Sequence, residues 1–348
     1  MTDAPLATQA PPGGDGLLGV GPLDADTAAA QALAAHLATE AGGFLRELPS
    51  VDLHTLRRVG AALHTFDQLL DPGWSRELRE ELERLGGLLG QERAYARRLA
   101  RLLAALDSLT CADPGAADRT AGPVPQQREA EGLLARHPGA PKARALLERQ
   151  LTLGRSRAHT SALQELGSAR FHALADRMTL LVSDLPLRPG AGTAPAEALL
   201  PCAATAAATL VGAVRALPLD RATVPYTGDM LHDPGDDQPW QQVRGLVLRT
   251  QYALEVCGPQ LGARAARPAA ALVDLARILA RHRDAAEAAE AAALAALTPR
   301  ITPATAYVLG VVHADQRLEV EAARHAFSST WPDLDRSGWL TDAWLTNR

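Results

Sequence analysis

Arginine and histidine side chains gather on one side of a helix predicted near the N-terminus. In residues 50–70, Arg57 and His64 stand seven positions apart, so they lie almost directly above one another on a helix. Arg58 lies beside them, and Asp67 is the only acidic residue at the margin of this face. Guanidinium groups form paired hydrogen bonds with phosphate, and a protonated imidazole adds a further donor. The pattern therefore predicts a basic face whose side chains suit an anion.

Further arginines follow at one-turn intervals on the next predicted helix. Arg93, Arg97 and Arg101 share one face, where their charges repel unless an anion or a carboxylate lies close. Basic residues recur at corresponding places in the second half of the chain. The alternative is that each stripe is merely the solvated face of an amphipathic helix, although such faces usually mix charges of both signs. The candidate binding residues are His54, Arg57, Arg58, His64, Arg93, Arg97, Arg101, Arg244, Arg249, Arg277, Arg281 and Arg283.

The composition predicts an all-α protein that carries this basic surface locally. Hydrophobic residues make up 47% of the 348 residues and aromatic residues only 4%. The chain is dominated by Ala, Leu, Arg and Glu, which favour helices. A net charge of −5 argues against a surface that attracts nucleic acid as a whole, so a polyanion site must be confined to part of the molecule. Lys142 is the only lysine among 35 basic residues, and a high genomic GC content would also enrich arginine.

Segments rich in Pro, Gly and Asp divide the chain into helical blocks. We expect a disordered tail over residues 1–22, a first helical bundle over 23–185, a second over 195–330, and a Trp-rich C-terminal extension over 331–348. A weak internal repeat relates the two bundles. The predicted helices are 24–47, 51–70, 75–107, 127–152, 158–183, 196–217, 239–257, 262–297 and 303–327.

Motifs for catalysis, cofactors and metals are missing from the sequence. There is no phosphate-binding GxxxxGK[ST] loop, no dinucleotide-binding GxGxxG, no zinc-binding HExxH and no GxSxG nucleophile motif. Cys111, Cys202 and Cys257 are widely spaced, which favours buried apolar roles over ligation. We therefore expect a protein that is not an enzyme and that holds no cofactor and no metal. No signal peptide or membrane-length apolar run is evident, so we expect a cytoplasmic location and no membrane partner.

Two segments resemble the repeated motif of the CHAD (conserved histidine alpha-helical domain) family. LHTLRRVGAALHTFDQLL (53–70) resembles the first copy, and QQVRGLVLRTQYALEVCGPQLG (241–262) resembles the second. Two registers remain open in the first copy, because the signature histidine falls either on His54 or on Ser50. In the second copy Gln241 occupies the histidine position. Gly60, Ala61, Leu248 and Gln251 lie near positions where the family carries Arg or Lys.

The resemblance implies two pseudo-symmetric four-helix bundles with a basic groove between them for inorganic polyphosphate. It also implies a non-catalytic binding module, which we expect to associate with polyphosphate granules. For such a site, Arg57, Arg97, Arg244 and Arg281 should converge on one cavity. The alternative is a degenerate scaffold that has lost tight polyphosphate binding and contacts protein partners instead. No sequence-specific nucleic-acid partner is expected.

Overall fold

The computed structural model describes residues 28–46, 52–111, 133–222 and 237–336, and this part of the chain is helical with no β-strand. The all-α prediction is confirmed. Isolated bridges such as that between Leu70 and Leu187 only tie loops together. The helices are α1 (Ala29–Arg46), α2 (Leu53–Thr65), α3 (Pro72–Thr110), α4 (Ala140–Leu166), α5 (Ala169–Ser183), α6 (Leu199–Arg215), α7 (Leu219–Ala222), α8 (Gln238–Val256), α9 (Gly258–Leu261), α10 (Ala266–Ala296) and α11 (Pro303–Arg336).

Local signals in the sequence set the starts of the helices that form the site. The Asp52 carboxylate accepts a hydrogen bond from the His54 backbone N–H and caps α2. Asp71 caps α3 in the same way, and Pro72 occupies the first helical position, where its missing N–H costs nothing. The buried side of α2 lies opposite the basic face that the sequence predicts. Its buried residues are Leu53, Leu56, Val59, Ala62 and Leu63, followed by Phe66 and Leu70 beyond the helix.

The predicted break between residues 152 and 158 is wrong, because α4 is continuous from Ala140 to Leu166. Gly154 lies inside this helix, where a Cβ would stand 2.6 Å from the Tyr95 ring. The glycine thus permits close packing of α4 on α3 and does not end the helix. The chain breaks at Gly167 instead, and the Ser168 hydroxyl then caps α5.

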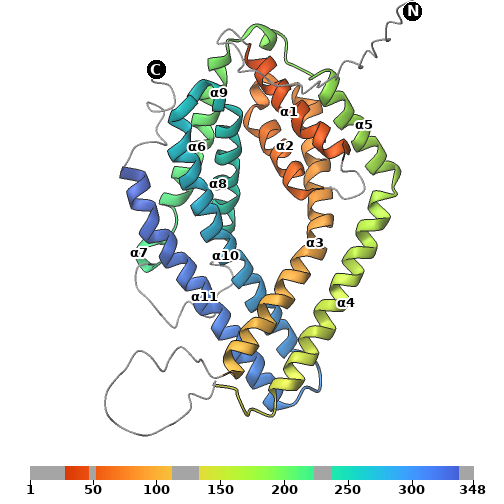
Figure 1. Ribbon diagram of the computed structural model, residues 1–348, viewed down its shortest axis with the longest axis vertical. Coiled ribbons are helices and arrows are strands. Elements are labelled where there is room, and N and C mark those ends of the chain that lie inside the picture. The colour runs from red at the N-terminus through yellow and green to blue at the C-terminus, as the bar shows by residue number, and fades with distance from the viewer. Residues whose placement is uncertain (1–27, 47–51, 112–132, 223–236, 337–348) are drawn as a thin grey trace, which may run out of the picture.

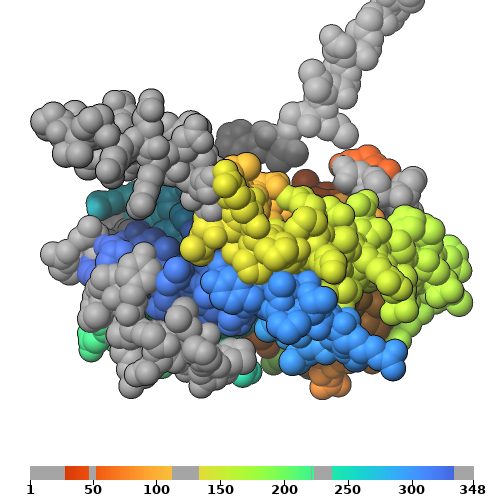
Figure 2. Space-filling view, turned by 90° about the horizontal axis from the view of Figure 1, so that it is seen from below, coloured from red at the N-terminus to blue at the C-terminus, as the bar shows by residue number. Residues whose placement is uncertain are grey.

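The helices form two arms that meet at one end of the molecule (Figure 1). In one arm α1, α2 and α5 lie beside the first part of α3, and in the other α6 and α8 lie beside the first part of α10. At the shared end α3, α4, α10 and α11 pack together. Figure 2, seen from below, shows α4 against α10 and α11 there. Buried residues of this end include Leu102, Leu147, Ala292, Val308 and Val312.

A second and larger core links the two arms at the other end. It includes Leu56 and Val59 of α2 together with Val243 and Val247 of α8. α2 therefore packs against α8, and the surface between them belongs to both sequence halves. The pseudo-two-fold relation and the proposed domain boundaries stay predictions.

The segment Ala196–Arg215, which contains α6, meets the length and hydropathy of a membrane span, contrary to the expectation from sequence. Its hydropathy has a second explanation, since 44% of it is buried within the described part of the protein. Leu199, Ala203 and Leu210 of α6 belong to the larger core. Cys202 and Cys257 are also buried, as predicted, and burial raises the pKa of the Cys257 thiol to about 12. Cys111 is exposed, so the prediction fails for this residue.

A buried ionic cluster fastens α8 to α10 and α11. The Asp237 carboxylate, at the start of α8, accepts hydrogen bonds from Arg317 at 2.6 Å and from Arg324 at 2.7 Å. The Arg324 side chain is 1% exposed; it also donates from Nε to Nε2 of His282 at 3.2 Å and lies over the Trp240 ring. In the sequence His282 is flanked by Arg281 and Arg283, but its side chain is 1% exposed and lies in the protein interior.

The stability of this cluster should depend on pH through His282. Burial, followed by the charge of Arg324, lowers the pKa of His282 to about 3, so the ring is neutral at pH 7 and its 3.5 Å contact with Asp237 is not an ion pair there. A histidine in the unfolded chain has a pKa of about 6.5. Below that pH the unfolded state binds a proton that the folded state does not, so folding stability falls by about 1.4 kcal/mol per pH unit between about pH 6.5 and pH 3.

We expect His282→Gln to flatten this dependence. The Gln carbonyl oxygen still accepts from Arg324 but does not titrate. Urea denaturation of both proteins between pH 7 and pH 5 measures the two slopes. Parallel slopes would show that His282 is not the titrating group.

Candidate functional site

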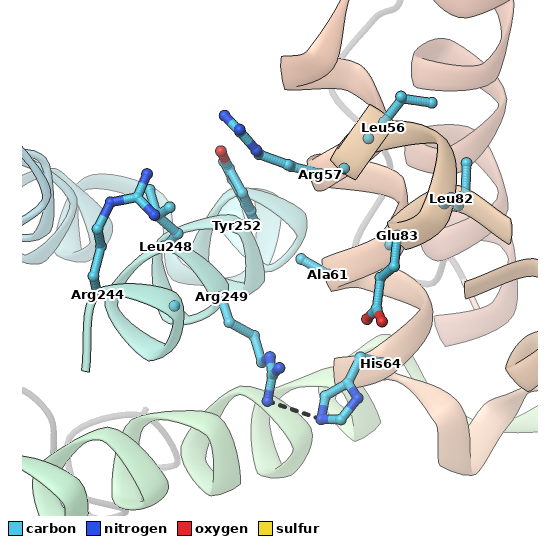
Figure 3. Close-up of a pocket in the computed structure, with 14 residues that line it drawn as sticks. Leu56, Arg57, Ala61, His64, Leu82, Glu83, Arg244, Leu248, Arg249 and Tyr252 are labelled. Atoms are coloured by element: carbon cyan, nitrogen blue, oxygen red, sulfur yellow. Dashed lines mark hydrogen bonds between the residues drawn. The ribbon is translucent and has the colours of Figure 1, made fainter. Parts of the chain in front are cut away.

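A cavity of about 380 Å³ lies between α2, α3 and α8. Arg57 and His64 reach it from α2, and Arg244 and Arg249 reach it from α8 (Figure 3). Tyr252 of α8 also lines it. The cavity therefore joins side chains from the two basic helices that the sequence singled out, one from each half of the chain.

Arg57 and Arg244 face the cavity without a carboxylate partner among the described residues. Arg57 lies at the exposed rim, whereas Arg244 is half-buried and its Nε is buried with no hydrogen-bond partner. Burial, followed by repulsion from Arg283 and Arg57, lowers the pKa of Arg244 to about 10. Burial is also the largest cause of the lowered pKa of Arg57. Arg244 still carries its charge at neutral pH. Asp284 and Glu287 favour this charge but form no ion pair with it, so an anion placed here would be stabilised.

His64 is enclosed by two guanidinium groups. Its Nδ1 lies 2.7 Å from Arg79 and its Nε2 lies 2.9 Å from Arg249. Burial, then the charges of Arg249 and Arg79, lower the pKa of His64, which favours the neutral ring over the cation that the sequence suggested. A neutral imidazole accepts only one hydrogen bond, so one of the two contacts brings a donor against a donor. This end of the cavity has more donors than acceptors.

Other predicted binding residues form ion pairs with carboxylates. Arg58 bridges α1 and α8, because it pairs with Glu40 at 3.4 Å and forms a short contact with Glu255. Arg97 pairs with Asp284 of α10 at 3.5 Å. The remaining pairs are Arg93 with Asp52 at 4.0 Å, Arg101 with Glu319 at 3.3 Å, Arg277 with Asp274 at 2.7 Å, and Arg283 with Asp284 at 2.5 Å.

The predicted convergence of four arginines on one cavity holds for two of them. Arg57 and Arg244 line it, and Arg97 lies close enough to lower the pKa of Arg57. Arg281 is exposed on α10 and does not line it. His54 lies beside the cavity, where its ring packs edge-on against Tyr252 with centroids 5.6 Å apart. Ser50 falls outside the described residues, so the register of the histidine motif stays open.

Sequence reasoning missed several residues of the site. Arg79 and Glu83 stand one turn apart on α3, within a stretch of mixed charge that predicts an ordinary solvated face. Tyr252 was noted only as part of the second repeated motif. The α2 helix was correctly oriented, but no periodicity indicates which residues of α3 face it across the cavity. Within the described ranges no group of three or more His, Cys, Asp or Glu side chains is placed to hold a metal ion.

This chain is similar to known proteins over most of its length. The family model described as "CHAD domain" matches residues 24–293. Among solved structures, PptA from Streptomyces chartreusis is 43% identical in sequence and superposes with a TM-score of 0.70. The match covers 88% of this chain and 100% of that one. No curated protein gives a match.

Proposed function

This chain belongs to the CHAD domain family, and from that premise we propose that it is a non-catalytic module that binds inorganic polyphosphate. The family is associated with polyphosphate binding. We place the contact at the cavity between α2 and α8, and we propose that the protein works in the cytoplasm in association with polyphosphate granules.

The observation that carries the proposal is the set of uncompensated arginines at this cavity. Arg57, Arg244 and Arg249 line it, and no described carboxylate forms an ion pair with them. Glu83 lines the same cavity and favours the charged form of Arg249, but it lies beyond ion-pair distance. Guanidinium groups in such surroundings bind phosphate oxygens with paired, charge-assisted hydrogen bonds. A linear chain of phosphates offers these groups several oxygens at once.

A second candidate function is a scaffold that contacts other proteins. The observation in its favour is that Arg58, Arg97 and Arg101 form ion pairs with carboxylates of other helices. These contacts connect the two sequence halves and leave fewer cations for a polymer. Binding of polyphosphate by the whole chain decides between the two functions.

The test is calorimetry of the full chain with long-chain polyphosphate at about 50 mM and about 200 mM salt. If three arginines displace condensed counter-ions from the polymer, the affinity should fall about 20-fold from the lower to the higher salt concentration. This value uses the salt dependence of binding to single-stranded nucleic acids. Heat of binding with this salt dependence supports the proposed function. No heat at low salt would favour the scaffold, and an affinity that does not change with salt would exclude arginine–phosphate contact as its basis.

A further inference from the structure

The cavity is not uniformly basic. Arg57 and Tyr252 lie toward one end, and Arg249 with His64 lies toward the other, with Ala61 between them (Figure 3). Arg57 and His64 are seven residues apart on α2, which corresponds to about 10 Å along the helix. Small and apolar residues line the rest of the cavity. They include Leu56, Gly60, Gly87, Gly245 and Leu248, which we call the neutral floor.

The glycines of the neutral floor border open space and not a tightly packed interface. A Cβ added to Gly60, Gly87 or Gly245 would meet no atom within 4 Å. Gly154 differs, because a Cβ there would collide with the Tyr95 ring. A glycine inside a helix costs about 0.5–1 kcal/mol relative to alanine. At the floor, close helix packing does not require the glycines, and a larger side chain at any of them would enter open space.

The two ends of the cavity differ in charge. At the end of Arg249, the nearby Glu83 carboxylate offsets part of the positive charge and adds a hydrogen-bond acceptor. Arg57 and Arg244 repel each other and have no acidic residue beside them in the cavity lining, although Asp284 and Glu287 of α10 favour the charged form of Arg244. Phosphate is therefore favoured at Arg57 and Arg244. The neutral floor offers no donor to a phosphate, so a polymer held by the arginines leaves it unused, whereas an uncharged ring would bury it.

We propose that this cavity also takes a phosphorylated nucleoside, whose phosphates contact Arg57 and Arg244 and whose uncharged ring system lies on the neutral floor. The inference rests on the proposed phosphate-binding role of the same arginines. A volume of about 380 Å³ lies within the range of small-molecule sites, which are mainly apolar with a few placed polar groups. Tyr252 and Leu248 supply the apolar wall, and Glu83, His64 and Arg249 supply polar groups for the ring. Because the phosphates use the same guanidinium groups, nucleotide and polyphosphate exclude each other.

The test compares ATP with inorganic tripolyphosphate, which has the same number of phosphates and no nucleoside. We expect calorimetry of the full chain at low salt to give at least tenfold tighter binding of ATP. In Gly60→Leu the new side chain enters the cavity, so ATP affinity should fall to that of tripolyphosphate while tripolyphosphate affinity is unchanged. Gly310→Leu is the matched control, since Gly310 is exposed on α11, is also free of contacts at Cβ and lies outside the cavity lining. Thermal melts of both variants check folding.

Equal affinity for ATP and tripolyphosphate, or unchanged ATP binding in Gly60→Leu, would overturn the inference. Binding of long-chain polyphosphate without ATP would overturn it and leave the proposed function intact. Binding of ATP without long-chain polyphosphate would support the nucleotide site and reject the polymer as ligand. Where both bind, added ATP should displace polyphosphate, and simultaneous binding would contradict the shared arginines.

Discussion

Replacing Asp237 with alanine is expected to lower the free energy of unfolding by about 3–5 kcal/mol, the usual cost of breaking a buried ion pair. The Asp237 carboxylate is the acceptor for both Arg317 and Arg324, whose side chains are 4% and 1% exposed. Removing it takes away the carboxylate that the two guanidinium groups share, although Arg324 keeps its ion pair with Glu321 at 3.2 Å, and it also releases the start of α8 from α11. Urea denaturation at pH 7, followed by circular dichroism, measures the loss.

Asp274→Ala is the matched control for this prediction. Asp274 also pairs with an arginine, Arg277, at 2.7 Å, but both side chains are more than half exposed. Ion pairs in such positions contribute about 0–1 kcal/mol, because water solvates both groups when the pair is broken. A loss in Asp237→Ala no greater than in Asp274→Ala would show that the buried cluster does not hold the second arm together.

The sequence was sufficient to orient α2 because one helix contains the whole pattern. Leu56, Val59 and Leu63 repeat with the helical period, so burial of that side fixes Arg57 and His64 on the opposite side. The same reasoning could not orient α10. His282 stands between two arginines in the sequence, and its neighbours suggest a basic stripe, but the ring faces Trp240 and Arg324 in the interior. Alanine-rich helices such as α10 have a weak apolar pattern and leave their rotation undetermined.

The partners of the arginines could not be predicted, since they come from helices distant in the sequence. Arg58 and Arg57 are adjacent and look alike on a helical wheel. Arg58 meets Glu255, 197 residues away, whereas Arg57 meets no carboxylate among the described residues. Charge patterning shows where cations lie on a helix but not which of them packing between helices neutralises. For the same reason the cavity, which is lined by residues from three helices, could not be predicted from the sequence.

The removal of both uncompensated arginines gives the largest expected effect on binding. In Arg57→Ala plus Arg244→Ala, the affinity for long-chain polyphosphate should fall by about 10²- to 10⁴-fold, since each charge-assisted hydrogen bond contributes roughly 1.5–3 kcal/mol. Stability should not fall with it. The two guanidinium groups repel each other in the unliganded protein, so their removal relieves an unfavourable interaction. Calorimetry at one low salt concentration gives the affinity, and a thermal melt gives the stability.

The double variant Arg277→Ala plus Arg281→Ala distinguishes binding at the cavity from general electrostatic attraction to the surface. This variant loses the same formal charge, and both of its arginines belong to the basic stripe predicted for the second half of the chain. They are exposed on α10 and do not line the cavity. If phosphate contacts Arg57 and Arg244 directly, the α10 variant should keep affinity within about threefold of the unaltered protein, because exposed charges act only through a screened field. Equal losses in the two double variants would mean that polyphosphate follows the overall charge of the surface and not the convergence of α2 and α8.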